Sequence, residues 1–337
     1  MVTGITILQY GFALSSTAVV VLQCGWFFVL LIFSYCRETS ISMLLVFFYC
    51  SAASIFVLDI LSYCSIARRQ YVCEKLLYPH MRILTFANNK GGVGKTTSAL
   101  SVAHRLAELG NQVLFIDADP QANASTASGL PAEYPHLGLA LTEGEGVPTL
   151  AALCYPLSTG LSMVRSARIM AQQEKGFGNA PDYQFFFRHQ LEDVRSRFNY
   201  VIIDTAPNLG PLTVSALVAS EAVFIPLQPN LFGSEGMTAL IEMVARLKRN
   251  FNPQLRVGGI FFTKYSPTYR KALHHQYARD LQADPALAAL IMRQTIRENV
   301  SLDEAQSMQR SIYDWAPNSN GAADYRNLTD EILTRIS

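Results

Sequence analysis

Residues 89–97 read Asn-Lys-Gly-Gly-Val-Gly-Lys-Thr-Thr and lie between an apolar run at 82–87 and a mixed stretch at 98–109 that ends at Gly110. The apolar run predicts a short buried strand, and the mixed stretch with its terminal glycine predicts a helix. Glycines between a strand and a helix let successive backbone N–H groups turn inward around an anion, and the helix presents its positive end to the same point. The segment therefore predicts a phosphate-binding loop in an α/β fold.

Two side chains of this phosphate loop (residues 89–97) have direct roles in nucleotide binding. Lys95 is placed to reach the β and γ phosphates, and Thr96 to offer its hydroxyl to Mg²⁺. Where a general phosphate loop has its first glycine, this chain has Asn89, and a second lysine follows. A glycine-rich turn that binds nothing is the alternative, and two lysines between a strand and a helix argue against it. The predicted nucleotide-binding residues are Lys90, Gly91, Gly92, Val93, Gly94, Lys95, Thr96 and Thr97.

Three segments resemble the sequence motifs of one family. Residues 90–97 resemble the deviant Walker A motif of the ParA/MinD group of P-loop ATPases. Residues 113–121, Val-Leu-Phe-Ile-Asp-Ala-Asp-Pro-Gln, resemble the second motif of that group. Residues 200–208, Tyr-Val-Ile-Ile-Asp-Thr-Ala-Pro-Asn, resemble its Walker B strand. The three motifs occur in the order that the family has.

The likeness extends through 221–228, 258–265 and 313–328, and so covers nearly all of residues 81–337. The Asp-Ala-Asp-Pro-Gln form and the region 318–325 are most similar to ParA partition ATPases. The resemblance implies an ATPase that uses ATP and Mg²⁺.

Three aspartates have expected roles at the ends of apolar strands. Asp204 ends one strand, where parallel sheets place ligand groups, and it can hold Mg²⁺ through the water shell of the ion. The resemblance implies that Asp117 orients the attacking water and that Asp119 supports the loop and the surroundings of the metal. It also implies that Lys90 crosses to the nucleotide of a partner subunit in an ATP-bound dimer, much as an arginine finger does. Lys90, Lys95 and Asp117 are thus the catalytic candidates, with Thr96 and Asp204 at the metal.

Strand-like and helix-like segments alternate from residue 82 to the end of the chain. Alternation of this kind predicts a mostly parallel, doubly wound sheet with helices on both faces, which is the P-loop NTPase class. The expected strands are 82–87, 113–117, 200–204, 222–227 and 257–263. The expected helices are 98–109, 186–197, 211–219, 235–249, 270–282 and 323–336.

The first eighty residues, here called the leader, differ in composition from residues 81–337. No charged side chain occurs before Arg37, whereas residues 81–337 hold 23 of the 27 basic and 23 of the 26 acidic residues. The apolar runs 12–33 and 41–64 are each long enough for a membrane-crossing helix, which needs roughly 20 residues. A two-helix membrane hairpin is one interpretation. The other is a mis-assigned start, because Met81 stands directly before the first strand of the domain at 81–337.

Basic residues are enriched toward the C-terminus. Residues 81–245 hold 10 basic and 14 acidic side chains, and residues 246–337 hold 13 and 9. Such an excess can neutralise DNA phosphates. A segment that reads Ile-Pro-Arg-Asn-Val-Arg-Leu in many relatives has Glu298 and Ser301 at its two basic positions, which puts DNA binding there in doubt. The candidate patch is Lys248, Arg249, Arg256, Lys264, Arg270, Lys271 and Arg293, with Lys248, Arg249, Arg270 and Lys271 as the DNA-binding candidates.

The resemblance to ParA partition ATPases implies an ATPase that dimerises with ATP and partitions DNA, stimulated by a ParB-like partner. We expect it to be cytoplasmic and nucleoid-associated, with membrane anchoring only through residues 12–64. A MinD-like or protein-cargo positioning ATPase, a membrane-linked tyrosine kinase and a non-enzymatic nucleotide-binding scaffold are the alternatives. Iron–sulfur carriers of the same superfamily need paired cysteines, and Cys154 is the only cysteine after residue 80.

Overall fold

The computed structural model describes residues 4–12, 15–24, 27–36, 41–49, 55–59, 81–142 and 146–337, with side chains described from Met81 onward except at 231–235. The chain divides into two compact units, Met1–Leu77 and Tyr78–Ser337. Within the described part of the chain, no helix has the length and hydropathy needed to cross a membrane.

The first unit contains five strands in one antiparallel sheet, in the order β1-β2-β3-β4-β5. The predicted helices at 12–33 and 41–64 fall partly on these strands, where the chain is extended, and partly on residues outside the described ranges. Runs rich in Val, Ile, Phe and Tyr suit a strand as well as an apolar helix, and apolarity alone does not separate the two. The strands are β1 (Gly4–Phe12), β2 (Ser15–Cys24), β3 (Phe27–Cys36), β4 (Ile41–Tyr49) and β5 (Ile55–Asp59).

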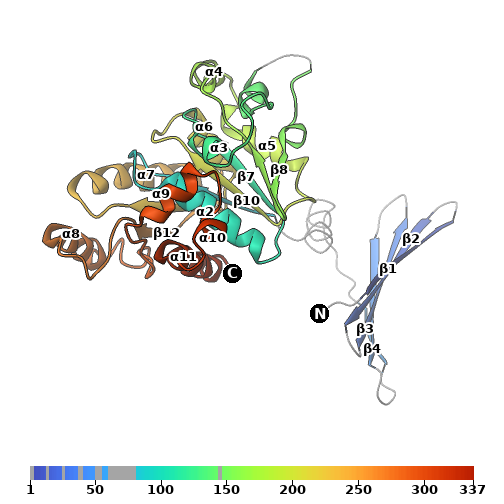
Figure 1. Ribbon diagram of the computed structural model, residues 1–337. Coiled ribbons are helices and arrows are strands. Elements are labelled where there is room, and N and C mark those ends of the chain that lie inside the picture. Colours follow the sequence, from blue (N-terminus) through green and yellow to red (C-terminus); the bar gives the residue numbers. More distant parts are fainter. Residues whose placement is uncertain are drawn as a thin grey trace. The chain divides into compact units, whose positions relative to one another are not determined.

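The second unit is built on a seven-stranded sheet of order β12-β11-β6-β10-β7-β9-β8, seen in Figure 1. All neighbours in it are parallel except β8, which runs antiparallel to β9 at the edge. The predicted α/β class and mostly parallel sheet are confirmed. The strands are β6 (Arg82–Phe86), β7 (Val113–Ala118), β8 (Tyr155–Ser158), β9 (Leu161–Val164), β10 (Tyr200–Thr205), β11 (Ala222–Leu227) and β12 (Arg256–Phe262).

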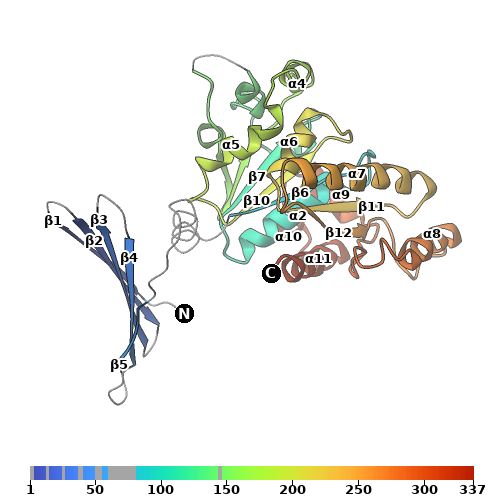
Figure 2. The same ribbon diagram turned by 180° about the vertical axis from the view of Figure 1, so that it is seen from behind.

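Helices cover both faces of this sheet, as the views from front and back show (Figures 1 and 2). On one face, Leu84 and Phe86 of β6 pack with α2 and with the C-terminal helices α9 to α11. On the other face, α4 to α7 cover alternate residues of the same strands. The helices are α2 (Lys95–Glu108), α3 (Asn123–Ala127), α4 (Met170–Phe177), α5 (Phe186–Glu192), α6 (Pro211–Ala219), α7 (Leu231–Asn250), α8 (Ala272–Ala283), α9 (Val300–Ser307), α10 (Ile312–Trp315) and α11 (Asn320–Ile336).

Tyr325 joins the last helix to the helix that follows the phosphate loop. Its side chain is 1% exposed, and its hydroxyl lies 3.0 Å from Ser98 Oγ of α2. Tyr313 donates a second bond from α10 to the carbonyl of Ser101, at 3.1 Å. Hydroxyls buried with partners stabilise the contact and give it a defined geometry. The C-terminal helices thus hold α2 against the sheet.

Gly258 offers a test of the packing between β12 and β11, because its neighbours on β11 leave no room for a side chain. A Cβ atom there would lie 2.7 Å from Cζ of Phe224 and 3.1 Å from Cβ of Ala222. We expect Gly258→Ala to lower the free energy of unfolding by about 1–3 kcal/mol, as overpacked cores do. Gly176→Ala is the control, since nothing lies within 4 Å of that added Cβ in α4. Equal melting temperatures for the two variants would contradict the packing described.

Candidate nucleotide-binding site

Three strands of the sheet bring the predicted site together at their carboxyl ends. β6 leads into the phosphate loop, β7 carries Asp117 and β10 carries Asp204. Asp204 pairs in register with Asp117 on one side and with Phe86 on the other. Parallel neighbours end at one edge, so the three motifs that are far apart in the sequence converge there.

The phosphate loop adopts a backbone that depends on two of its glycines. Gly92 and Gly94 have φ angles of 72° and 84°, in the left-handed region that costs other residues energy. No side chain caps the N-terminus of α2, which begins at Lys95. The first N–H groups of that helix are therefore available to an anion, and its dipole favours negative charge there.

Side chains from distant parts of the chain hold this loop in place. Thr263 Oγ1 donates to the carbonyl of Val93 at 2.9 Å, and Gln228 Nε2 donates to that of Gly92 at 3.3 Å. Lys95 Nζ donates to the carbonyl of Lys90 at 2.9 Å, across the interior of the loop. Three hydrogen bonds thus support the backbone of the loop.

Asp204 is buried, and both of its carboxylate oxygens lack a hydrogen-bond partner. Burial first, and then the charge of Asp117, raise the pKa of Asp204 well above its ordinary value, while Thr96 and Lys95 lower it only in part. A buried carboxylate of this kind requires a cation or a proton. Carboxylate and hydroxyl oxygens are ligands that Mg²⁺ prefers. The residues present therefore fit a magnesium ion held by Thr96 and Asp204.

Asp117 is fully buried but well bonded. Its Oδ2 accepts from the backbone N–H and the hydroxyl of Ser125, at 2.8 and 2.7 Å, and its Oδ1 accepts from the N–H of Asp119 at 3.2 Å. Burial raises the pKa of Asp117 to about 6, and the bonds from Ser125 oppose that rise. Asp119 accepts from the N–H of Gln121 at 2.9 Å and so closes the turn after β7.

The two lysines of the loop lie in different surroundings. Burial lowers the pKa of Lys95, and the charges of Asp204 and Asp119 act in the opposite direction. Lys90 Nζ instead donates to Asn230 Oδ1 at 2.9 Å. The predicted crossing of Lys90 to a partner subunit stays a prediction.

A cavity of about 580 Å³ opens beside the turn after β7 and is lined in part by Asp119, Gln121 and Asn208. Glu174 of α4 also lines it and accepts from the N–H of Leu212 at 3.2 Å, at the start of α6. Burial raises the pKa of Glu174. Sequence analysis missed Thr263 beside the phosphate loop, Ser125 beside Asp117 and Glu174 in this cavity, because nothing in their local sequence marks these contacts.

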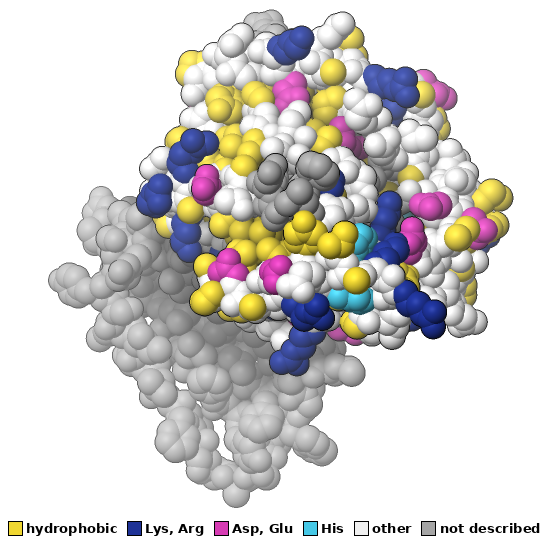
Figure 3. All heavy atoms as spheres, turned by 90° about the vertical axis from the view of Figure 1, so that its left-hand side faces the viewer, with side chains coloured by type: hydrophobic (Ala, Val, Ile, Leu, Met, Phe, Trp, Pro, Cys, Tyr) yellow, Lys and Arg dark blue, Asp and Glu magenta, His cyan; other side chains and the backbone are white. Residues whose placement is uncertain are grey.

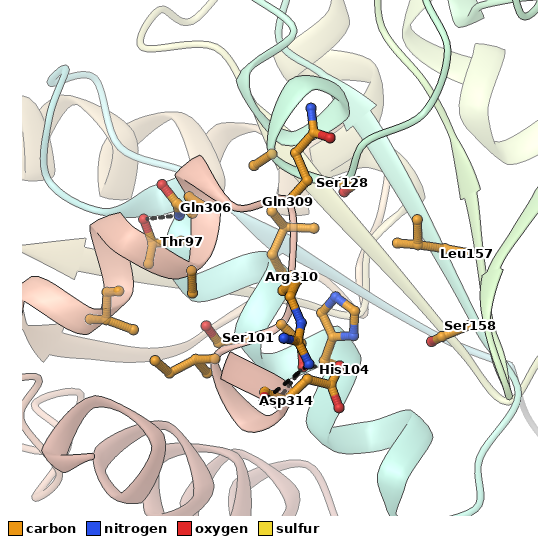
Figure 4. Close-up of a pocket in the computed structure, with 16 residues that line it drawn as sticks. Thr97, Ser101, His104, Ser128, Leu157, Ser158, Gln306, Gln309, Arg310 and Asp314 are labelled. Carbon is orange, nitrogen blue, oxygen red and sulfur yellow. Dashed lines mark hydrogen bonds between the residues drawn. The ribbon is translucent and has the colours of Figure 1, made fainter. Parts of the chain in front are cut away.

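Thr97 is turned toward a second, smaller cavity of about 170 Å³ on the other side of α2 (Figure 4). Its hydroxyl accepts from Gln306 Nε2 of α9 at 2.8 Å. His104 of α2 and Arg310 point into the same cavity in Figure 4, and Arg310 donates to the carbonyl of Asp314 at 3.3 Å. Thr97 therefore connects the phosphate loop to α9, and its hydroxyl does not join the group around Asp204.

The candidate DNA-binding residues lie on two separate elements. Lys248 and Arg249 end α7, whereas Arg270 and Lys271 come just before α8. Lys271 Nζ lies 3.3 Å from Glu298 Oε2, so the acidic one of the two replacements faces a candidate cation directly. On the side of the molecule where α7 and α8 lie, Lys and Arg side chains are spread out between hydrophobic and acidic ones (Figure 3).

Two further basic residues of the predicted patch have partners within the fold. Arg256 lies 3.6 Å from Glu221 and donates to the carbonyl of Arg335 at 3.1 Å. Arg293 donates to Glu331 at 3.0 Å only through its backbone N–H, and the residue itself is exposed. Arg256 thus serves the contact between β12 and α11, and a smaller set of cations remains exposed for a ligand.

Thr263 gives a direct test of the loop's support. Thr263→Val keeps the shape of the side chain but leaves the buried carbonyl of Val93 without its donor. We expect the free energy of unfolding to fall by about 1 kcal/mol and ATP binding to weaken several-fold, measured by thermal unfolding and calorimetry. Thr263→Ser, which keeps the hydroxyl, should bind ATP nearly as well as the unchanged protein. Equal affinity for both variants would show that the bond is dispensable.

Comparison with known proteins places this site in a family. A family model described as an AAA domain matches residues 81–257. The chain is 34% identical over 260 residues to the chromosome partitioning protein ParA of Caulobacter vibrioides, a match that covers 76% of this chain and 95% of that protein. It is 34% identical over 261 residues to the chromosome-partitioning ATPase Soj of Thermus thermophilus, which covers 77% and 99%.

Solved structures share the fold. Cobyrinic acid a,c-diamide synthase from Mycobacterium smegmatis, with a bound ATP analogue and magnesium, superimposes with a TM-score of 0.64 at 25% identity over 76% of this chain and 96% of that one. McdA from Cyanothece in complex with ATP gives 0.66 at 19% identity, over 76% and 97%. The predicted family and the predicted ATPase activity are confirmed. The chain belongs to the ParA/Soj family of P-loop ATPases.

Proposed function

We propose that this protein is an ATP-driven switch that dimerises on ATP and partitions DNA. The observation that carries the proposal is the buried, unpartnered carboxylate of Asp204, which lies between Asp117 and Lys95 at the end of the sheet. That group suits a Mg²⁺–nucleotide complex. The partitioning roles named for the relatives from Caulobacter and Thermus support the choice of DNA as cargo.

The residues around Asp204 divide the work of phosphoryl transfer. The N–H groups of the phosphate loop and the ammonium of Lys95 bind the β and γ phosphates, for which Lys95 leaves the carbonyl of Lys90. Thr96 and Asp204 would hold Mg²⁺, which would supply charge neutralisation for those phosphates. Asp117, kept in one orientation by Ser125, orients the attacking water.

Lys90 makes the switch depend on a second copy of the chain. Its ammonium, bonded to Asn230 in the structure, exchanges that bond for a phosphate oxygen of the partner's nucleotide. ATP then favours the dimer, and hydrolysis reverses it. A ParB-like protein would accelerate that step, in keeping with the resemblance.

Binding and hydrolysis should be separable in two variants. Lys95→Ala removes the cation that faces the phosphates, and we expect ATP affinity to fall at least about tenfold in calorimetry. Asp117→Ala should still bind ATP with Mg²⁺ and accumulate as a dimer in light scattering, because only the water-orienting carboxylate is removed. A monomeric Asp117→Ala protein in saturating ATP would argue against the assigned roles.

DNA binding should depend on ATP and ignore sequence. Arg270→Glu together with Lys271→Glu should weaken binding to every duplex alike, and should lower the slope of log affinity against log salt by about 0.9 for each phosphate that is no longer neutralised. Glu298→Gln should strengthen binding, because it removes the carboxylate 3.3 Å from Lys271. Arg195→Glu, which changes an exposed residue of the segment after α5, is the control. If the ATP-bound dimer does not bind duplex DNA of random sequence at low salt, DNA is ruled out as the surface to which the protein binds.

A further inference from the structure

A buried serine outside the predicted motifs contacts the groups that hold Asp117. Ser166 follows β9 and the buried Arg165, and it is 0% exposed. Its backbone N–H donates to Ser125 Oγ at 2.8 Å, and its hydroxyl donates to the carbonyl of Asp119 at 2.6 Å. Both partners lie more than 40 residues earlier in the chain. By contrast, the hydroxyl of Ser128 bonds the carbonyl of Ala124, which is only 4 residues earlier in the chain.

These bonds link Ser166 to both oxygens of the Asp117 carboxylate. The link to Oδ2 runs through Ser125, and the link to Oδ1 runs through the backbone of Asp119. Because the N–H of Ser166 occupies the oxygen of Ser125 as a donor, the hydroxyl hydrogen of Ser125 is directed to Asp117 Oδ2, 2.7 Å away. The N–H of Asp119 donates to Asp117 Oδ1, while its carbonyl is held by Ser166. Hydrogen bonds in such a chain strengthen one another in a buried site.

We propose that Ser166 is a positioning residue for ATP hydrolysis, which fixes the carboxylate of Asp117 through Ser125 and through the backbone of Asp119. This inference rests on the proposed role of Asp117 in orienting the attacking water. A carboxylate held from both sides keeps the water in line with the γ phosphate, and misplacement of a reacting group by about 1 Å can cost 100-fold in rate. Ser166 also lies 3.2 Å from Met170 Sδ, so the orientation of Asp117 depends on the segment that enters α4.

The variant Ser166→Ala isolates the hydroxyl. It keeps the N–H bond to Ser125, and the carbonyl of Asp119 keeps its bond from the N–H of Ala122 at 2.9 Å, so the fold loses no obligatory partner. We expect kcat for ATP hydrolysis by the full chain to fall about tenfold, with KM and the calorimetric affinity for Mg²⁺–ATP unchanged within about twofold. Ser125→Ala should lower kcat at least as much. Thr126→Ala, which alters an exposed neighbour on α3, should change neither constant.

A double-mutant cycle distinguishes positioning from a general structural effect. In an Asp117→Ala background, Ser166→Ala should lower the residual rate no further, because the effect acts through that carboxylate. Unchanged kcat in Ser166→Ala, a joint change of kcat and KM, or an undiminished effect in the Asp117→Ala background would each overturn the proposal. Full turnover by Asp117→Ala alone would instead remove the role proposed for Asp117 itself.

Discussion

The carboxylate of Asp204, buried without a hydrogen-bond partner, governs the chemistry at the edge of the sheet. Its pKa is raised well above the ordinary value by burial and by Asp117, and the ammonium of Lys95 opposes that shift only in part. An uncompensated buried charge costs several kcal/mol, so the site is more stable with a cation than without one. In the proposed function, binding of Mg²⁺ and nucleotide would therefore stabilise these strand ends.

Asp117 and Asp204 are paired in register on neighbouring strands and are equally buried, yet their surroundings differ. Asp117 receives three hydrogen bonds from protein groups, whereas no hydrogen bond of ordinary geometry from the described residues reaches Asp204, on which the hydroxyl of Thr96 acts only weakly. In the proposed function, Asp117 is held in one orientation to orient water, and Asp204 would keep its oxygens for an ion. Neighbouring strands therefore carry the same residue type into two roles, and the difference arises from the turn after β7 and from α3.

Much of the fold was predictable from residues 82–337, because strands buried on both faces are continuous apolar runs and the helices between them are longer and mixed. The strands at 82–87, 113–117, 200–204 and 222–227 were expected close to where they lie. The β8–β9 hairpin was not, since Tyr155–Ser158 and Leu161–Val164 are too short to show a period. The short helices α9 and α10 were missed for the same reason, and the helix expected at 186–197 ends at Glu192.

The sequence by itself predicted a phosphate-binding loop, because the glycines, Lys95 and Thr96 are adjacent in the chain and their spacing matches a known pattern. It also placed Asp117 and Asp204 at strand ends, since an apolar run shows where a strand stops. Only the tertiary structure decided what holds these groups: Thr263 on Val93, Ser166 on Ser125 and Asp119, and Glu298 against Lys271. Each of these interactions joins segments 27 to 170 residues apart. Such pairings follow from the order of strands in the sheet and from side-chain packing, for which the local sequence carries no signal.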